Sequence, residues 1–133
     1  MELNERLAEA ASKRGDWAEA AELWHRVYLS ERFDDERACL ETSRALYELG
    51  DLESAEAMAA DGRRRFPESF ALMEYHGVIL EATGYRRAAE SAYASALESQ
   101  PSLVVALLGL GRVRLLLGLP DSAVRPLRQL VEI

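Results

Sequence analysis

The 133-residue sequence is poor in the side chains on which several kinds of site depend. Its single cysteine, Cys39, allows no internal disulfide, which is consistent with a reducing compartment. It has only two histidines, His25 and His76, and neither stands at a metal-type spacing with the cysteine or with the other histidine. We therefore predict structural roles for these three side chains, and neither a metal site nor a cofactor.

Basic residues are also few. Lysine and arginine together number 16, with Lys13 the only lysine, against 23 acidic residues, so the net charge is -7. Phosphate binding draws its affinity from basic surface, so we predict no nucleic-acid partner. The run Arg63 to Arg65 falls at the end of an expected helix, where cations offset the helix dipole and cover a solvated face.

No apolar stretch is long enough to span a bilayer. The longest, residues 103–111, is followed closely by Arg112 and Arg114. The first residues include Glu2 and Glu5 and contain no apolar segment of the kind found in secretory signals. We predict no membrane insertion and a cytoplasmic location.

One short pattern occurs four times along the chain. It begins at glycines spaced 35, 34 and 34 residues apart, namely Gly15, Gly50, Gly84 and Gly118. Five residues after each glycine stands an alanine, namely Ala20, Ala55, Ala89 and Ala123. A glycine can take the left-handed conformation that ends a helix, and a small alanine lets two antiparallel helices approach closely beyond the turn. A fixed period of this kind predicts a repeat of two helices.

The repeats have recognisable boundaries. We place them at residues 1–35, 36–69, 70–103 and 104–133 of a single domain. Asp16 and Asp51 are positioned to cap the second helix of their repeats, and Pro120 suits the first turn of the last helix. Pro67 and Pro101 follow helical runs and end their repeats. The sequence leaves open whether Pro126 kinks or ends the last helix.

With these residues in place, the pattern resembles the tetratricopeptide repeat family. The third repeat matches best, at Gly77, Gly84, Ala89, Tyr93, Ala96, Leu97 and Pro101. The second repeat departs from the family at Thr42 and Ser43, where Leu and Gly are usual. The resemblance implies an all-α, superhelical array of antiparallel helix pairs, an α-solenoid of about four repeats. It further implies a non-enzymatic scaffold that binds a peptide or helical segment of a partner protein in a concave groove lined by the first helices.

Family geometry also implies which residues face that groove. They are Glu5, Glu9, Arg37, Leu40, Arg44, Tyr47, Glu74, Val78, Glu81, Leu108, Arg112 and Leu115. Some family members clamp a terminal carboxylate with Lys and Asn in the first repeats, where this chain has Glu5 and Glu9. We therefore expect no carboxylate clamp, and we expect the groove arginines to pair with acidic side chains of a ligand.

The last helix raises two alternatives, because it has apolar residues where such arrays usually end in a polar capping helix. These residues are Leu127, Leu130, Val131 and Ile133. Either the chain is the repeat region of a larger bacterial enzyme, one of sugar or sulfate transfer, or this end mediates self-association. The first repeat has a net charge of -4 and the last of +2, which favours end-to-end assembly of copies into a homo-oligomer. We predict no catalytic residues within the chain itself.

Overall fold

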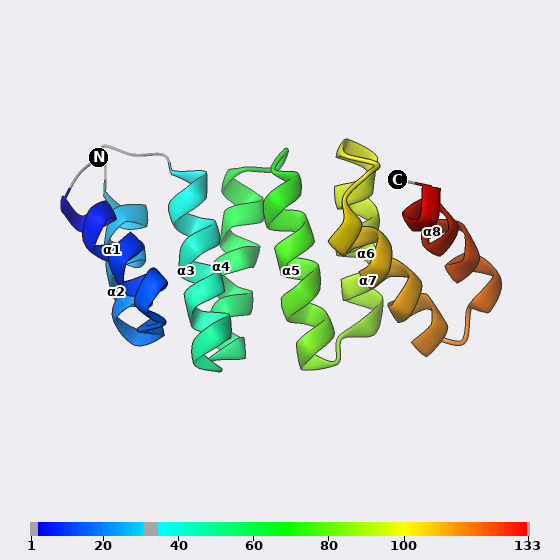
Figure 1. Ribbon diagram of the computed structural model, residues 1–133, viewed down its shortest axis with the longest axis horizontal. Helices are drawn as coiled ribbons and strands as arrows, with labels where there is room; N and C mark the ends of the chain where they lie inside the picture. The colour runs from blue at the N-terminus through cyan, green and yellow to red at the C-terminus, as the bar shows by residue number, and fades with distance from the viewer. Residues whose placement is uncertain (1–2, 31–34, 133) are drawn as a thin grey trace. The chain divides into compact units, whose positions relative to one another are not determined.

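The chain is all-α, as predicted. A computed structural model describes residues 3–30 and 35–132, which contain eight α-helices (Figure 1). Their bounds are α1 Leu3–Arg14, α2 Trp17–Leu29, α3 Glu36–Leu49, α4 Leu52–Arg65, α5 Phe70–Thr83, α6 Arg86–Ser99, α7 Val104–Leu116 and α8 Pro120–Glu132. In this described part of the chain, no helix is both long enough and apolar enough to cross a membrane.

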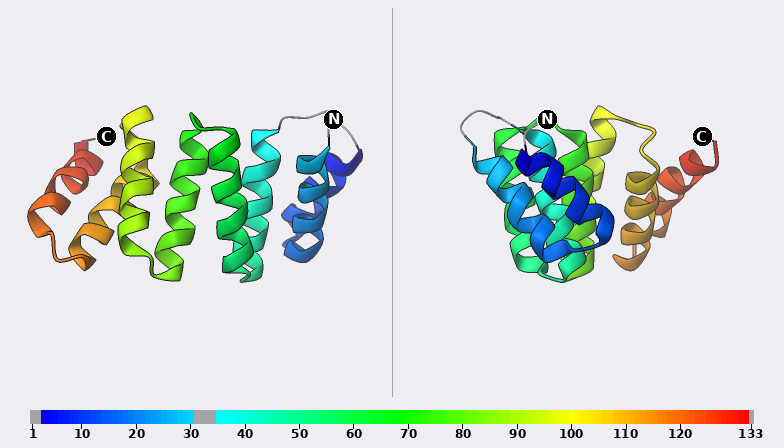
Figure 2. Two further views of the ribbon diagram at one scale, coloured as in Figure 1. Left: turned by 180° about the vertical axis from the view of Figure 1, so that it is seen from behind. Right: turned by 60° about the vertical axis from the view of Figure 1, so that its left-hand side comes forward.

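The helices form four sequential antiparallel pairs, so the prediction of about four two-helix repeats is confirmed. The pairs are grouped into two compact units. The N-terminal unit, residues 1–67, contains α1 to α4, and the C-terminal unit, residues 68–133, contains α5 to α8. Within each unit every helix packs against the next along the chain, as the two views in Figure 2 show.

The turn inside each helix pair contains the predicted glycine at a positive φ angle, and in the first two pairs also the predicted capping aspartate. Gly50 and Gly84 have φ angles of 94° and 88°, a region in which any side chain would be strained. The carboxylate of Asp16 accepts from the backbone N–H of Glu19, and Asp51 caps α4 in the same way. Tyr85 occupies the equivalent position before α6, and its side chain makes no capping hydrogen bond.

The core of the N-terminal unit shows how the departures from the family pattern are accommodated. Thr42 and Ser43 are buried, and each hydroxyl donates to the carbonyl one helical turn earlier, at 2.6 and 3.0 Å. No unpaired hydroxyl is therefore buried at either position. Trp24 is also buried, and its indole N–H donates to Ser12 of α1 at 3.1 Å.

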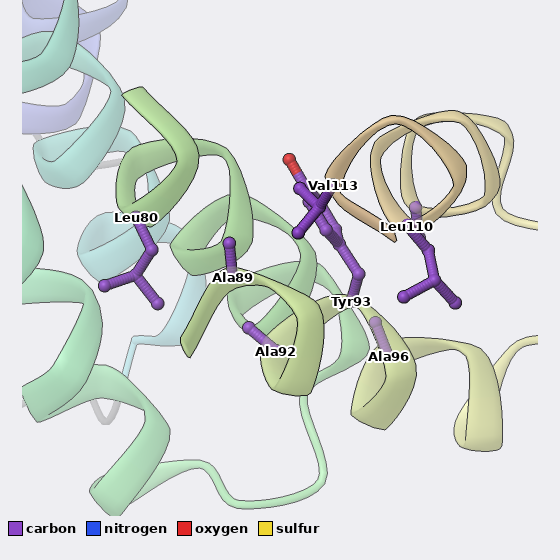
Figure 3. Close-up of a cluster of buried hydrophobic side chains, with 8 residues drawn as sticks. Leu80, Ala89, Ala92, Tyr93, Ala96, Leu110 and Val113 are labelled. Atoms are coloured by element: carbon purple, nitrogen blue, oxygen red, sulfur yellow. The ribbon is translucent and has the colours of Figure 1, made fainter. Parts of the chain in front are cut away.

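The core of the C-terminal unit is organised around Tyr93 of α6 (Figure 3). This ring lies between Gly77 of α5 and Gly109 of α7. A Cβ atom would lie 2.7 Å from the ring at Gly77 and 2.5 Å from it at Gly109. The two glycines therefore let both first helices close around a large, fully buried aromatic side chain.

Pro126 does not end helix α8. The helix begins at Pro120, as predicted, and continues through Pro126 to Glu132. Pro126 is buried. The next side chain, Leu127, packs against Gly111 of α7, where a Cβ would lie 2.5 Å from the leucine. The proline thus lies inside a helix that is held on α7 by leucine packing.

Candidate partner-binding surfaces

In the N-terminal unit, two of the predicted groove residues meet across α1 and α3. The Arg37 guanidinium donates to the Glu9 carboxylate at 2.5 Å and lies 5.0 Å from the centre of the Trp24 ring. The hydrogen bond to Glu9 raises the pKa of Arg37 despite partial burial. The pair therefore links the first helices of two successive repeats.

The other groove residues predicted in this unit lie along the same two helices. Arg44 donates to Glu41, one turn earlier on α3, at 3.2 Å. Glu5, Leu40 and Tyr47 are each partly exposed. The surface is consequently mixed, with carboxylates, guanidinium groups and apolar atoms side by side.

The C-terminal unit brings three side chains into one network. Arg112 of α7 donates to Glu81 of α5 from both Nε and Nη2, the latter at 2.8 Å, and the Tyr93 hydroxyl donates to the same carboxylate at 2.9 Å. The bond from Arg112 lowers the pKa of Glu81 against the opposing effect of burial. Burial, reinforced by the carboxylate, raises the pKa of Tyr93. Glu81 is thus held ionised between an arginine and a phenol.

Glu74 has a structural role that its sequence position did not indicate. Its carboxylate, on α5, accepts from the backbone N–H of Ala106 in the first turn of α7 at 3.1 Å. Helix α7 follows Leu103, whose side chain has no acceptor, so Glu74 supplies the cap from another helix. Burial raises the pKa of the Glu74 carboxyl, and the hydrogen bond opposes that rise.

Apolar side chains surround the Glu81–Arg112 pair. On α7, Val105, Leu108 and Leu115 are 49%, 44% and 53% exposed. They recur at helical spacing along the side of α7 that carries Arg112. We call this patch, together with the partly exposed Val78 of α5, the first-helix surface of the C-terminal unit.

The three arginines expected to pair with a ligand already have partners within the chain. Arg37 contacts Glu9, Arg44 contacts Glu41, and Arg112 contacts Glu81. An acidic ligand would have to compete with these carboxylates. The sequence did not predict this, because each partner on another helix lies 28 or 31 residues away.

The residues predicted at the C-terminal end are in different environments. Leu127 and Leu130 are partly buried, and Leu127 is engaged with Gly111 inside the unit. Val131 is 86% exposed. Ile133 lies outside the described residues.

The two histidines and the cysteine have different surroundings. Cys39 is fully buried, and burial raises its pKa to about 11. His76 is buried in α5, whereas His25 is exposed on α2 with its ring centre 6.5 Å from that of Tyr28. The described residues contain no group of three side chains that could hold a metal ion.

Each unit also has a hollow that sequence reasoning missed. The N-terminal hollow, about 510 Å³, lies between α2, α3 and α4, and its walls include Tyr28, Met58 and Asp61. The C-terminal hollow, about 410 Å³, lies between α6, α7 and α8, and its walls include Arg114 and Arg125. Both hollows open between the second helices of successive repeats. A comparison of the repeats position by position could have revealed their linings.

One wall of the N-terminal hollow is a polar cluster. The Tyr28 hydroxyl donates to Asp61 Oδ2 at 2.5 Å, and Arg64 donates to Asp61 Oδ1 at 3.1 Å. Burial raises the pKa of Tyr28 to about 12, and the bond from Tyr28 is the largest cause of the lowered pKa of Asp61. Arg65 lies over the Tyr28 ring, 4.6 Å from its centre. The arginine run lies in the last turn of α4, as predicted, and Arg65 also contacts Tyr28 of α2.

The eight helices of the described residues, in four glycine-turned pairs, define a helical-repeat protein. The model of the tetratricopeptide repeat family matches residues 40–85 and 82–133, and the chain belongs to this family. Domains of this family are typically protein–protein interaction modules and are typically non-catalytic.

Solved structures share the fold at low sequence identity, whereas no curated protein matches the sequence. MamA is 16% identical, with a TM-score of 0.87 over 96% of this chain and 74% of MamA. The first tetratricopeptide domain of Spaghetti (RPAP3), solved bound to the HSP90 peptide SRMEEVD, is 16% identical, with a TM-score of 0.81 over 87% of this chain and 91% of that domain. TTC0263 of Thermus thermophilus is 23% identical, with a TM-score of 0.74 over 96% of this chain and 71% of TTC0263. At these identities the likeness shows the fold alone.

Proposed function

We propose that this chain is a non-enzymatic scaffold that binds a peptide or helical segment of a partner protein on the first helices of its repeats. The observation that carries this proposal is the first-helix surface of the C-terminal unit. It exposes three apolar side chains of α7, Val105, Leu108 and Leu115, around one fixed ion pair. Exposed apolar side chains beside a few fixed polar groups are typical of surfaces that bind proteins.

The ion pair adds orientation to this apolar contact. Arg112 binds Glu81 through Nε and Nη2, so the Nη1 edge of the guanidinium can donate to an acceptor on a bound segment. The pair has no net charge, and we therefore expect a partner segment with apolar side chains and a carbonyl or amide acceptor. A strongly acidic segment would gain little from this neutral pair.

The N-terminal unit contributes the Glu9–Arg37 pair, Glu5 and the partly exposed Tyr47 to the same proposal. The similar domain of Spaghetti (RPAP3) was solved with a peptide bound, which supports a peptide as the class of ligand. Glu5 would repel a terminal carboxylate, and Arg37 is already bonded to Glu9 and is not open to clamp one, so we expect an internal segment of the partner. We place this activity in the cytoplasm, where a reducing environment keeps Cys39 as a thiol.

The test is a screen of immobilised peptides from the host proteome, followed by affinity measurement on the best binders. We expect Leu108→Glu to weaken binding at least tenfold, because it places a charge in the centre of the apolar contact. Tyr85→Asp is the matched control: it also replaces an exposed apolar side chain with a carboxylate, but in the turn before α6. Equal losses in both variants, or no loss in Leu108→Glu, would contradict the proposal.

Self-association through α8 is a second candidate, favoured by the exposure of Val124 and Val131 on that helix. Its test is light scattering of the whole chain across protein concentration at low salt. Association that Val131→Glu abolishes would support this candidate. A strictly monomeric signal at the highest concentration would remove it.

A further inference from the structure

Within each unit, one second helix packs against the first helix of the next repeat: α2 against α3, and α6 against α7. Two positions on this side of the second helix lie six and thirteen residues after the turn glycine. In α2 they hold Ala21 and Tyr28, which are buried and line the N-terminal hollow beside residues of α3. In α6 they hold Glu90, whose carboxylate accepts from α7, and Leu97, which packs into a core shared by α6 and α7. We call these positions the stacking face of a second helix.

Helix α8 has an aliphatic residue at both positions of the stacking face. Val124 lies six residues after Gly118, and Val131 lies thirteen residues after it. Their exposed fractions are 47% and 86%. Helix α8 packs against α7 of its own repeat, and that contact leaves both valines in water. The face that α2 and α6 cover inside the chain is therefore apolar and uncovered on α8.

The first helices have a matching face. The positions twelve and eight residues before the turn glycine lie on the side of the helix that packs against the preceding second helix. In α3 and α7 the residues at these positions are at most 5% exposed, namely Ala38, Thr42, Ala106 and Leu110. In α1 the same positions hold Leu3 and Leu7, which are 69% and 44% exposed. Helix α1 therefore has two leucines in water where its counterparts are buried.

The two contacts inside the chain have the same register. Tyr28 of α2 and Thr42 of α3 line the N-terminal hollow together. Leu97 of α6 and Leu110 of α7 line the C-terminal hollow together. Each pair joins the position thirteen residues after one turn glycine to the position eight residues before the next. The repeat fold therefore determines which positions of the two helices meet.

We propose that α8 of one copy packs against α1 of a second copy, in the register that joins α2 to α3 and α6 to α7. Val131 then meets Leu7, so two exposed aliphatic side chains leave water together. A second copy fits this face because one chain carries both halves of the contact. The first and last repeats also have opposite net charges, -4 and +2, which favours their approach. The two faces differ, so the contact is heterologous.

This proposal rests on self-association, the second candidate function, and names the face that α8 meets. The test is size-exclusion chromatography with light scattering, applied to the whole chain at low salt. Leu7→Glu and Val131→Glu each place a charge in the apolar contact, and each should weaken association by about tenfold or more. Leu49→Glu is the matched control, because it changes an exposed leucine at the end of α3, outside both faces, and should associate as the wild type does.

A mixing experiment tests the pairing of the two faces. Leu7→Glu retains an intact α8, and Val131→Glu retains an intact α1. An equimolar mixture of the two variants should therefore form complexes of one copy of each. These complexes should stop at two chains, because a further contact would bring the two introduced glutamates together. Circular dichroism of each variant should match the wild type, since both altered residues are exposed in a single copy.

Three results would overturn the proposal. A strictly monomeric wild type at the highest concentration would remove it together with the second candidate function, whereas the peptide screen would still decide on the first-helix surface. Association lost in Val131→Glu but kept in Leu7→Glu would show that α8 meets another face, with self-association itself retained. A mixture of the two variants that stays monomeric, although the wild type associates, would exclude the pairing of α8 with α1.

Discussion

Gly109→Ala should destabilise the chain, although alanine is ordinarily the better residue inside a helix. An alanine in an open helix position stabilises by about 1 kcal/mol relative to glycine. Here the new Cβ would lie 2.5 Å from Tyr93 Cζ, 2.6 Å from Cε2 and 2.9 Å from the hydroxyl oxygen. These distances are far below van der Waals contact, so the ring or α7 must shift.

The ring has little room to shift. Tyr93 is fully buried, its hydroxyl is bonded to Glu81, and Gly77 closes on its other side. Overpacking of a filled core costs about 1–3 kcal/mol, and at these distances we take about 3 kcal/mol. After the gain in helix propensity, the net loss is about 2 kcal/mol, which corresponds to a fall in Tm of about 6–10 °C for a chain of this size.

The assay is thermal and urea unfolding followed by circular dichroism, in the wild type and in a Tyr93→Leu background. Tyr93→Leu is destabilising in itself, so the effect of Gly109→Ala is compared within each background. Without the ring, Gly109→Ala should raise Tm, because only the gain in helix propensity remains. A rise in Tm in the wild type, or equal falls in both backgrounds, would refute the reasoning.

Three further predictions concern the helix caps, the buried thiol and the carboxylate network. Tyr85→Asp should stabilise the chain by about 1 kcal/mol in urea unfolding, because it gives α6 the cap that Asp51 gives α4; no gain would show that the turn before α6 is already satisfied. Cys39, buried and with its pKa raised to about 11, should react with a thiol reagent at pH 8 only as fast as the chain opens, so the rate should rise in step with added urea. Fast labelling of native protein would contradict that burial. Glu81→Gln should cost about 1 kcal/mol at pH 7. The pKa of Glu81 is lowered by folding, so its stabilising effect is present above its ordinary value of 4.5 and is lost as the pH falls through the lowered value. Unfolding of both proteins across pH 2–7 should therefore show the difference between wild type and Glu81→Gln disappear in acid; a difference independent of pH would contradict the assignment.

The elements that could be predicted from the sequence are those with local causes. A glycine that needs a positive φ angle and an aspartate that caps the next helix act within a few residues, and both recur with the period of the repeat. The turns at Gly15 and Gly50, the cap at Asp16 and the helix start at Pro120 were accordingly all predicted correctly.

The interactions of the candidate site could be predicted only in part, because they join helices. The sequence placed Glu81 and Arg112 in one groove but not in contact, since nothing local sets the distance between α5 and α7. Glu74 was placed on the same surface, and its bond to Ala106 depends on where α7 begins. Each hollow is lined by three helices, so no local pattern in the sequence indicates its lining.

Because Glu74 of α5 caps α7, the first turn of α7 depends on a helix that is synthesised before it. A ribosome releases α5 before α7, so the carboxylate that will complete the first turn of α7 is already outside when that turn emerges. The dependence has only one direction, because α5 is capped by its own neighbour Ser69. A chain that ends at Ser99 therefore retains every cap of α5. A chain that begins at Val104 lacks the Glu74 carboxylate, which caps α7. Synthesis from the N-terminus therefore produces the capping residue Glu74 before α7, the helix that it caps.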